Sequence, residues 1–139
     1  MNKLLVLIFV VLTLGIIYIT FNQPGEERFS TQFSEITFLR NENNTGPINR
    51  IYAVYAQDSI WGDLQSYAAS KPYTKYGSTK VYFFIRDYPE TSFLSWQDPN
   101  VPPSMQETCI ALYHKENNGR VTFRKYPFKG TIVSLNLSK

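Results

Sequence analysis

The sequence predicts an α+β protein in which a single N-terminal transmembrane helix is followed by one small domain with a mostly antiparallel sheet packed on one helix. Three observations predict this fold class. Residues 4–21 form an apolar run without any charged side chain. Several short stretches after residue 48 are rich in β-branched and aromatic residues, which is typical of strands. Residues 59–70 repeat apolar side chains at the spacing of an amphipathic helix.

The N-terminal run has the length of a membrane span. At 1.5 Å per residue, a helix over residues 4–21 is about 27 Å long, close to the hydrocarbon thickness of a bilayer. A cleaved signal peptide is the competing interpretation, and Lys3 supplies the basic start that it needs. However, the residues from Ile16 to Phe21 are too bulky for a small-x-small cleavage site. The sequence therefore favours an uncleaved anchor.

Charge predicts the orientation of this anchor. Lys3 and the amino terminus precede the apolar run, whereas Glu26, Glu27 and Arg28 follow it. Positive charge is retained on the cytoplasmic side of a membrane. We therefore expect a cytoplasmic N terminus and a main domain that is periplasmic or extracellular.

The rest of the chain has room for one domain. We divide the chain into a cytoplasmic start (1–3), the anchor (4–21), a tether with a possible edge strand (22–47) and an exported α+β domain (48–139). The 14 basic and 11 acidic residues nearly balance, which argues against nucleic acid as a partner. A single cysteine, Cys109, excludes an intramolecular disulfide, so the core must depend on its many aromatic residues.

The first half of the domain predicts a strand, a helix and a second strand. Residues 50–56 and 80–86 are apolar on both faces, as expected for strands in the centre of a sheet. The helix between them is expected to begin at an N-cap formed by Asp58 and to end before Pro72.

The second half predicts a hairpin and possible edge strands. Residues 109–115 and 121–126 flank Asn118 and Gly119, the strongest short hairpin signal in the chain. Weaker alternation of apolar and polar residues at 33–39 and 133–138 predicts one more strand at each end of the domain.

One helix can cover only one face of such a sheet, so the other face needs a second cover. Residues 87–103 contain four prolines and are predicted to be a loop. This loop carries Phe93 and Trp96, which could cover the second face. A partner protein is the alternative cover.

The residues that could carry catalysis or bind metal are scattered. Cys109 and His114 lie five apart on one predicted strand, where they are expected to point to opposite faces about 17 Å apart. A thiol–imidazole pair needs direct contact, so we expect a buried cysteine instead. No nucleotide-binding or hydrolase motif is found in the sequence. The acidic residues that could bind a metal ion are scattered along the chain: Asp58, Asp63, Asp87, Glu90 and Asp98. We therefore predict no catalytic residue, no cofactor and no metal site.

Aromatic residues in predicted loops and turns give the one lead to function. Exposed aromatic side chains mark surfaces that bind proteins or sugars. The alternative is that they fold back over the sheet as ordinary core. The candidate interaction surface consists of Tyr73, Tyr76, Tyr88, Phe93, Trp96, Tyr126 and Phe128.

These observations predict a non-enzymatic protein of the cell envelope. We expect an accessory or structural subunit that is anchored in the lipid bilayer and binds membrane proteins in a hetero-oligomeric complex. The alternative is a module that binds glycan or peptidoglycan through the loop aromatics. A small enzyme with a carboxylate site near Asp87 and Glu90 is a third hypothesis.

Overall fold

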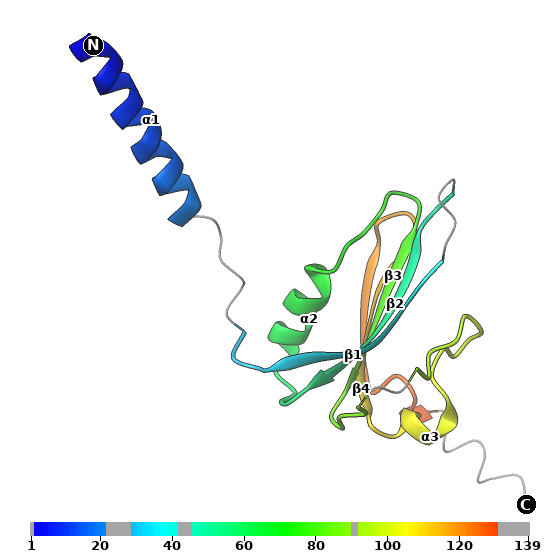
Figure 1. The fold of residues 1–139 in the computed structure, drawn as a ribbon. Helices are drawn as coiled ribbons and strands as arrows, with labels where there is room; N and C mark the ends of the chain where they lie inside the picture. Colours follow the sequence, from blue (N-terminus) through cyan, green and yellow to red (C-terminus); the bar gives the residue numbers. More distant parts are fainter. Residues whose placement is uncertain (1, 22–28, 42–45, 90–91, 131–139) are drawn as a thin grey trace, which may run out of the picture.

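The computed structural model describes residues 2–21, 29–41, 46–89 and 92–130. Helix α1 spans Lys3–Phe21 (Figure 1). Its window from Lys3 to Thr20 is long and apolar enough to cross a membrane, and none of it is buried. A signal sequence near an N terminus would meet the same criterion of length and composition.

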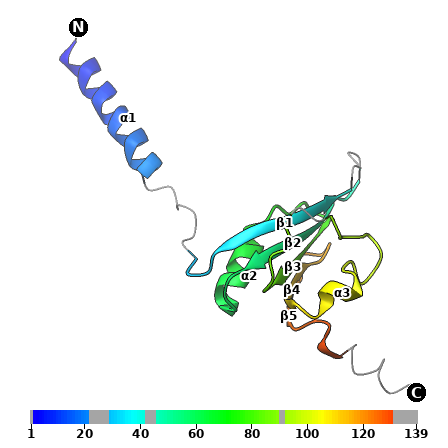
Figure 2. The same ribbon diagram turned by 60° about the horizontal axis from the view of Figure 1, so that its bottom comes forward.

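The predicted α+β fold is confirmed. Five strands form one sheet in the order of the sequence, with α2 on one side of it and α3 on the other (Figures 1 and 2). The strands are β1 (Phe33–Arg40), β2 (Asn49–Ala56), β3 (Ser78–Phe84), β4 (Cys109–Lys115) and β5 (Val121–Lys125). The domain helices are α2 (Trp61–Ala69) and the single turn α3 (Pro103–Gln106).

The sheet is mixed but mostly antiparallel. β2 and β3 run parallel to each other, whereas the β1–β2, β3–β4 and β4–β5 pairs are antiparallel. A parallel pair needs a crossover between its strands, and α2 lies in this crossover. The crossover places α2 against the sheet and leaves β1 and β5 as the outer strands.

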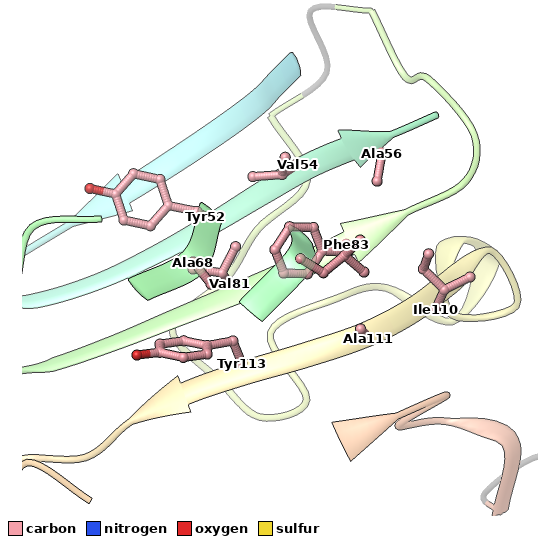
Figure 3. Close-up of a cluster of buried hydrophobic side chains, with 10 residues drawn as sticks. Tyr52, Val54, Ala56, Ala68, Val81, Phe83, Ile110, Ala111 and Tyr113 are labelled. Carbon is pink, nitrogen blue, oxygen red and sulfur yellow. The ribbon is translucent and has the colours of Figure 1, made fainter. Parts of the chain in front are cut away.

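The apolar core on the α2 face is formed by alternate residues of β2 and β3 together with the buried side of α2. Leu64 and Ala68 of α2 are buried against Val54 of β2 and Phe83 of β3 (Figure 3). Tyr113 of β4 belongs to the same cluster. A buried phenylalanine of this kind contributes about 3–5 kcal/mol relative to alanine.

The opposite face of the sheet is covered from within the chain. The segment that connects β3 to β4, described at 85–89 and 92–108, buries Leu94 and Val101 against Tyr82 and Phe84 of β3. Phe93 packs at the border of the same cluster. The predicted Pro-rich loop therefore supplies the second cover.

The start of α2 differs from the prediction. The residue that precedes the helix is Ile60, and its side chain makes no capping hydrogen bond, so the expected cap at Asp58 is wrong. A carboxylate of the first turn has a tertiary role instead, because Asp63 Oδ2 accepts a hydrogen bond from the backbone N–H of Thr31 at 2.9 Å.

The two predicted edge strands have different outcomes. The stretch at 33–39 is strand β1, which pairs with β2 along its length, so part of the expected tether belongs to the sheet. The possible strand at 133–138 lies outside the described residues.

Two glycines test the packing of the fold. A Cβ on Gly77 would overlap the backbone carbonyl of Ile48, whereas a Cβ on Gly62 in α2 would meet nothing within 4 Å. We expect Gly77→Ala to lower the free energy of unfolding by about 3 kcal/mol, because backbone must move. We expect Gly62→Ala to raise it by up to about 1 kcal/mol through helix propensity.

The free energy of unfolding of each full-length variant in detergent is measured by denaturant titration, with tryptophan fluorescence as the signal. Equal effects of the two substitutions would contradict the close approach of the chain at Gly77.

Candidate functional site

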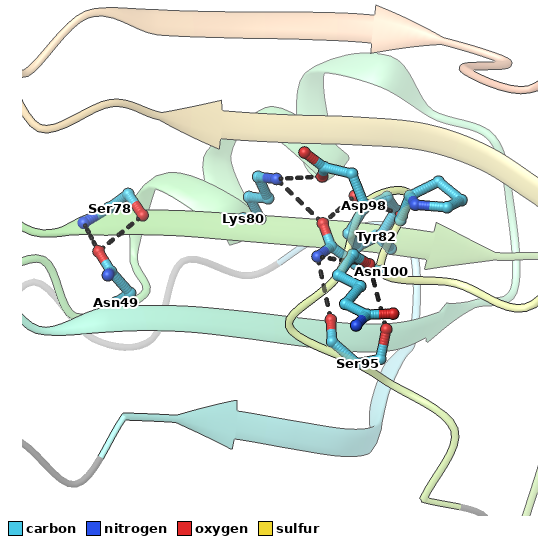
Figure 4. A network of polar contacts seen from close by, with 9 residues as sticks. Asn49, Ser78, Lys80, Tyr82, Ser95, Asp98 and Asn100 are labelled. Carbon is cyan, nitrogen blue, oxygen red and sulfur yellow. Dashed lines mark hydrogen bonds and ion pairs between the residues drawn. The ribbon is translucent and has the colours of Figure 1, made fainter.

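The buried residue Asn100 makes several of the hydrogen bonds that hold the β3–β4 connection to the sheet. Asn100 is 2% exposed and has a backbone φ of 67°, in the left-handed region that asparagine tolerates better than most residues. Its side-chain Nδ2 donates to the carbonyl of Ser95 at 3.0 Å within the connection. Its Oδ1 accepts from Tyr82 Oη at 2.8 Å and from Lys80 Nζ at 2.9 Å on β3 (Figure 4). This one side chain therefore joins the cover to the strand beneath it.

Beside Asn100, the face of the sheet that the β3–β4 connection covers becomes polar. A pocket of about 390 Å³ lies there. The pairing of the strands brings Lys80 of β3 opposite His114 of β4, and Leu112 opposite Arg124 of β5. Directly paired residues point to the same face of a sheet. Three basic side chains from three neighbouring strands therefore line one pocket, called here the basic pocket.

The electrostatics of the basic pocket are visible at His114. Burial lowers the pKa of His114 below its usual range, and the nearby cations Lys80 and Arg124 lower it further. The carboxylates of Glu116 and Asp98 act in the opposite direction but do not reverse the shift. His114 is therefore neutral at neutral pH. Lys80 Nζ also contacts Asp98 Oδ1 at 3.1 Å, but this carboxylate is 84% exposed and is well screened by water.

The predicted separation of Cys109 and His114 onto opposite faces is wrong. β4 carries one residue more than β3 between two paired positions, since Phe83 pairs with Ala111 and Phe84 with Cys109. Because of this β-bulge at Ile110, the side chain of Cys109 lies on the same face of the sheet as those of Leu112 and His114. Burial raises the pKa of the Cys109 thiol to about 12, so it is neutral and unreactive in the folded protein.

The seven predicted interaction residues do not form one surface. Tyr76, Trp96 and Tyr126 are exposed by 65%, 49% and 37%. They belong to three different segments, and no ring contact among those described joins two of these three residues. A pair of coplanar exposed rings, which a sugar-binding surface would use, is not found among them.

The other four predicted residues pack against the domain. Phe128 is buried and stacks on Tyr82, so it belongs to the core. Tyr88 and Phe93 are half-buried and contact each other at the border of the same cluster. Tyr73 is half-buried, and its hydroxyl donates to the carbonyl of Glu116 at 3.1 Å. These four rings therefore contribute to the packing of the domain.

The enzyme hypothesis named Asp87 and Glu90 as the acids near its carboxylate site. Asp87 is exposed to solvent, and Glu90 lies outside the described residues. Among the residues that the structure describes, no group of three or more His, Cys, Asp and Glu side chains is placed to hold a metal ion.

One partly exposed aromatic surface was mostly missed from the sequence, which named Tyr126 alone among its three rings. It lies on the α2 face of the outer strand β5 and is called here the β5 surface. Trp61 of α2 contacts the rings of Phe123 and Tyr126 with centroids 6.3 and 5.8 Å apart. Ile60 and Val121 extend it and are 43% and 49% exposed. Trp61 and Val121 are 60 positions apart in the sequence. That they belong to one surface follows from the packing of α2 on the sheet, which the sequence does not show.

Cations lie over the rings of the β5 surface. Lys125 Nζ lies 4.7 Å from the ring centroid of Trp61, and Lys129 Nζ lies 3.7 Å from that of Tyr126. The ion pairs among the described residues are Lys71–Glu35 and Lys80–Asp98, so neither of these two lysines has a carboxylate partner there. The β5 surface thus combines apolar rings with uncompensated positive charge.

No protein-family model matches the chain, and no curated protein or solved structure matches it.

The role of Asn100 can be tested by two substitutions. Asn100→Gly removes the side-chain hydrogen bonds but suits the left-handed backbone, and we expect the free energy of unfolding to fall by about 2–3 kcal/mol. Asn100→Ala must also hold alanine at positive φ, which costs about 1 kcal/mol more. Denaturant unfolding of the full-length protein measures both. Equal losses would show that the backbone conformation carries no cost.

The burial of Cys109 predicts its reactivity. With the pKa of the thiol raised to about 12, the thiolate fraction at pH 8 is on the order of 10⁻⁴. We expect a disulfide reagent to label the folded full-length protein very slowly at pH 8, and faster as pH rises toward 12. Denaturant should expose the thiol and make labelling rapid at pH 8. Since Cys109 is the single cysteine of the chain, rapid labelling of the folded protein would contradict its burial.

Proposed function

We propose that the protein is a single-pass, membrane-anchored accessory subunit of a cell-envelope complex and that it acts without catalysis. In this proposal α1 is retained as the anchor, the N terminus is cytoplasmic, and the α+β domain is periplasmic or extracellular. The β5 surface carries the proposal, as the docking site for a membrane-protein partner.

The chemistry of the β5 surface supports a protein partner. Interfaces are enriched in aromatic side chains, and their central residues are apolar. The exposed ring of Tyr126 and the exposed side chain of Val121 provide apolar contact area. Lys125 and Lys129, which lack carboxylate partners in the described part of the chain, would pair with acidic side chains of the partner. The expected partner surface is therefore apolar with an acidic rim.

The chain length supports a partner close to the membrane. Phe29, where the description of the domain begins, follows the end of α1 at Phe21 by eight residues. Eight residues span at most about 28 Å even when fully extended. If α1 lies in the bilayer, the domain cannot move far from its surface, which raises the effective concentration of any membrane-bound partner.

In-cell photo-crosslinking tests the proposal. A photoreactive residue at Val121, an exposed position at the edge of the β5 surface, should give one crosslinked product of defined mass in cells that naturally contain the protein. The same residue at Tyr76, which is even more exposed but lies elsewhere, should not give this product. Combined replacement of Lys125 and Lys129 by glutamate should reduce the product at least fivefold, because the charge of the docking site is reversed.

The control for charge is Lys75→Glu. Lys75 lies over the ring of Tyr76 at 5.1 Å, so this substitution reverses a charge in the same kind of cation–ring contact outside the β5 surface. The product should persist in this variant. Equal products from Val121 and Tyr76, or a product with the mass of two copies of this chain, would overturn the proposal.

A further inference from the structure

The basic pocket lies on the opposite face of the sheet from the β5 surface and has a separate use. Its two cations, Lys80 and Arg124, come from β3 and β5, which flank β4 and therefore lie about 10 Å apart. Lys80 and His114 face each other across β3 and β4, and Arg124 lies one strand further on. The volume of about 390 Å³ is in the range of sites for small molecules.

Two of the charged groups are able to bind a ligand directly. The Lys80 ammonium uses two of its three donors, on Asn100 Oδ1 at 2.9 Å and Asp98 Oδ1 at 3.1 Å, so one donor remains. Arg124 is exposed and is in neither of the ion pairs among the described residues. Its planar guanidinium can bind a carboxylate through two parallel hydrogen bonds.

The balance of charge selects the ligand. Lys80 and Arg124 are positive, Asp98 is negative and His114 is neutral, so the pocket carries one net positive charge. A singly charged carboxylate matches this balance, whereas a phosphate dianion would exceed it unless His114 were protonated.

The side chains that line the pocket indicate which chemical group would lie beside the carboxylate of the ligand. Leu112 and Phe128 line it together with Pro99 and Pro127. These side chains offer apolar contacts beside the cations. A ligand that fits both parts has an apolar body next to its carboxylate.

We propose that the basic pocket binds a small carboxylate ligand with an apolar side chain, held by Arg124 and Lys80 and in contact with Leu112 and Phe128. This chemistry occurs both in free small acids and at the C termini of peptides. The site does not depend on the proposed docking function, because its side chains lie on the other face of the sheet.

Nuclear magnetic resonance of the imidazole of His114 gives a direct readout, since His114 is the single histidine of the chain. The full-length protein in detergent is titrated with N-acetyl-leucine, with its uncharged amide N-acetyl-leucinamide, and with inorganic phosphate. We expect saturable shifts of the His114 signals with the acid and at least tenfold weaker binding of the amide and of phosphate. A peptide arm, N-acetyl-Ala-Ala-Leu, distinguishes the two sources: tighter binding than N-acetyl-leucine indicates a peptide terminus, and weaker binding indicates a small acid.

The bound carboxylate should also change the titration of His114. Lys80, Arg124, Glu116 and Asp98 act on the imidazole in the free protein. An added negative charge favours the imidazolium, so we expect the pKa of His114 to rise by about one pH unit. Linkage then requires the acid to bind more tightly as pH falls through this range.

Two neighbouring residues of β5 provide matched variants. Arg124→Gln should weaken binding of N-acetyl-leucine at least tenfold. Lys125→Gln removes the same charge from the next residue, but Lys125 is paired with Ala111 and faces α2, so binding should change less than twofold. Equal effects of the two variants, equal binding of the acid and its amide, tighter binding of phosphate, or unshifted His114 signals would each overturn the proposal.

Discussion

The fold depends on the fact that its central strands are apolar on both faces. Such a sheet is stable only when both faces are covered, and the described part of the domain provides one helix longer than a single turn for this purpose. The second cover must therefore be irregular chain, whose buried backbone groups need hydrogen-bond partners. Asn100 meets this need, because its amide bonds both to the connection and to Tyr82 on the strand below. Other groups of the connection are satisfied by bonds such as those from Tyr82 Oη to the carbonyl of Pro99 and from Gln106 Nε2 to the carbonyl of Val101.

The limited reach of this cover explains where the basic pocket lies. The β3–β4 connection buries the rows of the sheet that contain Phe84 and Tyr82 but ends beside Lys80. Beyond that point, the residues of the face are polar because water reaches them, and Lys80 serves both as an anchor for the connection and as a wall of the pocket. At the end of the connection, Lys80 is therefore held in place by Asn100 and is still accessible to a ligand in the basic pocket.

Most of the elements could be predicted from the sequence, whereas the sites depended on contacts that the sequence does not reveal. Runs of apolar residues predicted β2, β3 and β4, and the Asn-Gly turn predicted the β4–β5 hairpin. The bulge at Ile110 was missed because a strand that is apolar on both faces has no alternation in which an extra residue could be seen. The role of Asp63 was missed because its partner is Thr31, which is distant in the sequence.

Strand β5 connects the two proposed surfaces through its alternation. Arg124 points into the basic pocket, whereas Phe123 and Lys125 face α2, because successive residues of a strand point to opposite faces. The sheet lies between the two surfaces, so an acidic partner and a carboxylate ligand would not compete for the same cation. Coupling between them would require β5 to differ in position between the free and docked states, since two sites influence each other only through a shared change of state. β5 is an outer strand with β4 as its one strand neighbour in the described part of the chain, so fewer strand contacts oppose such a change than for the central strands.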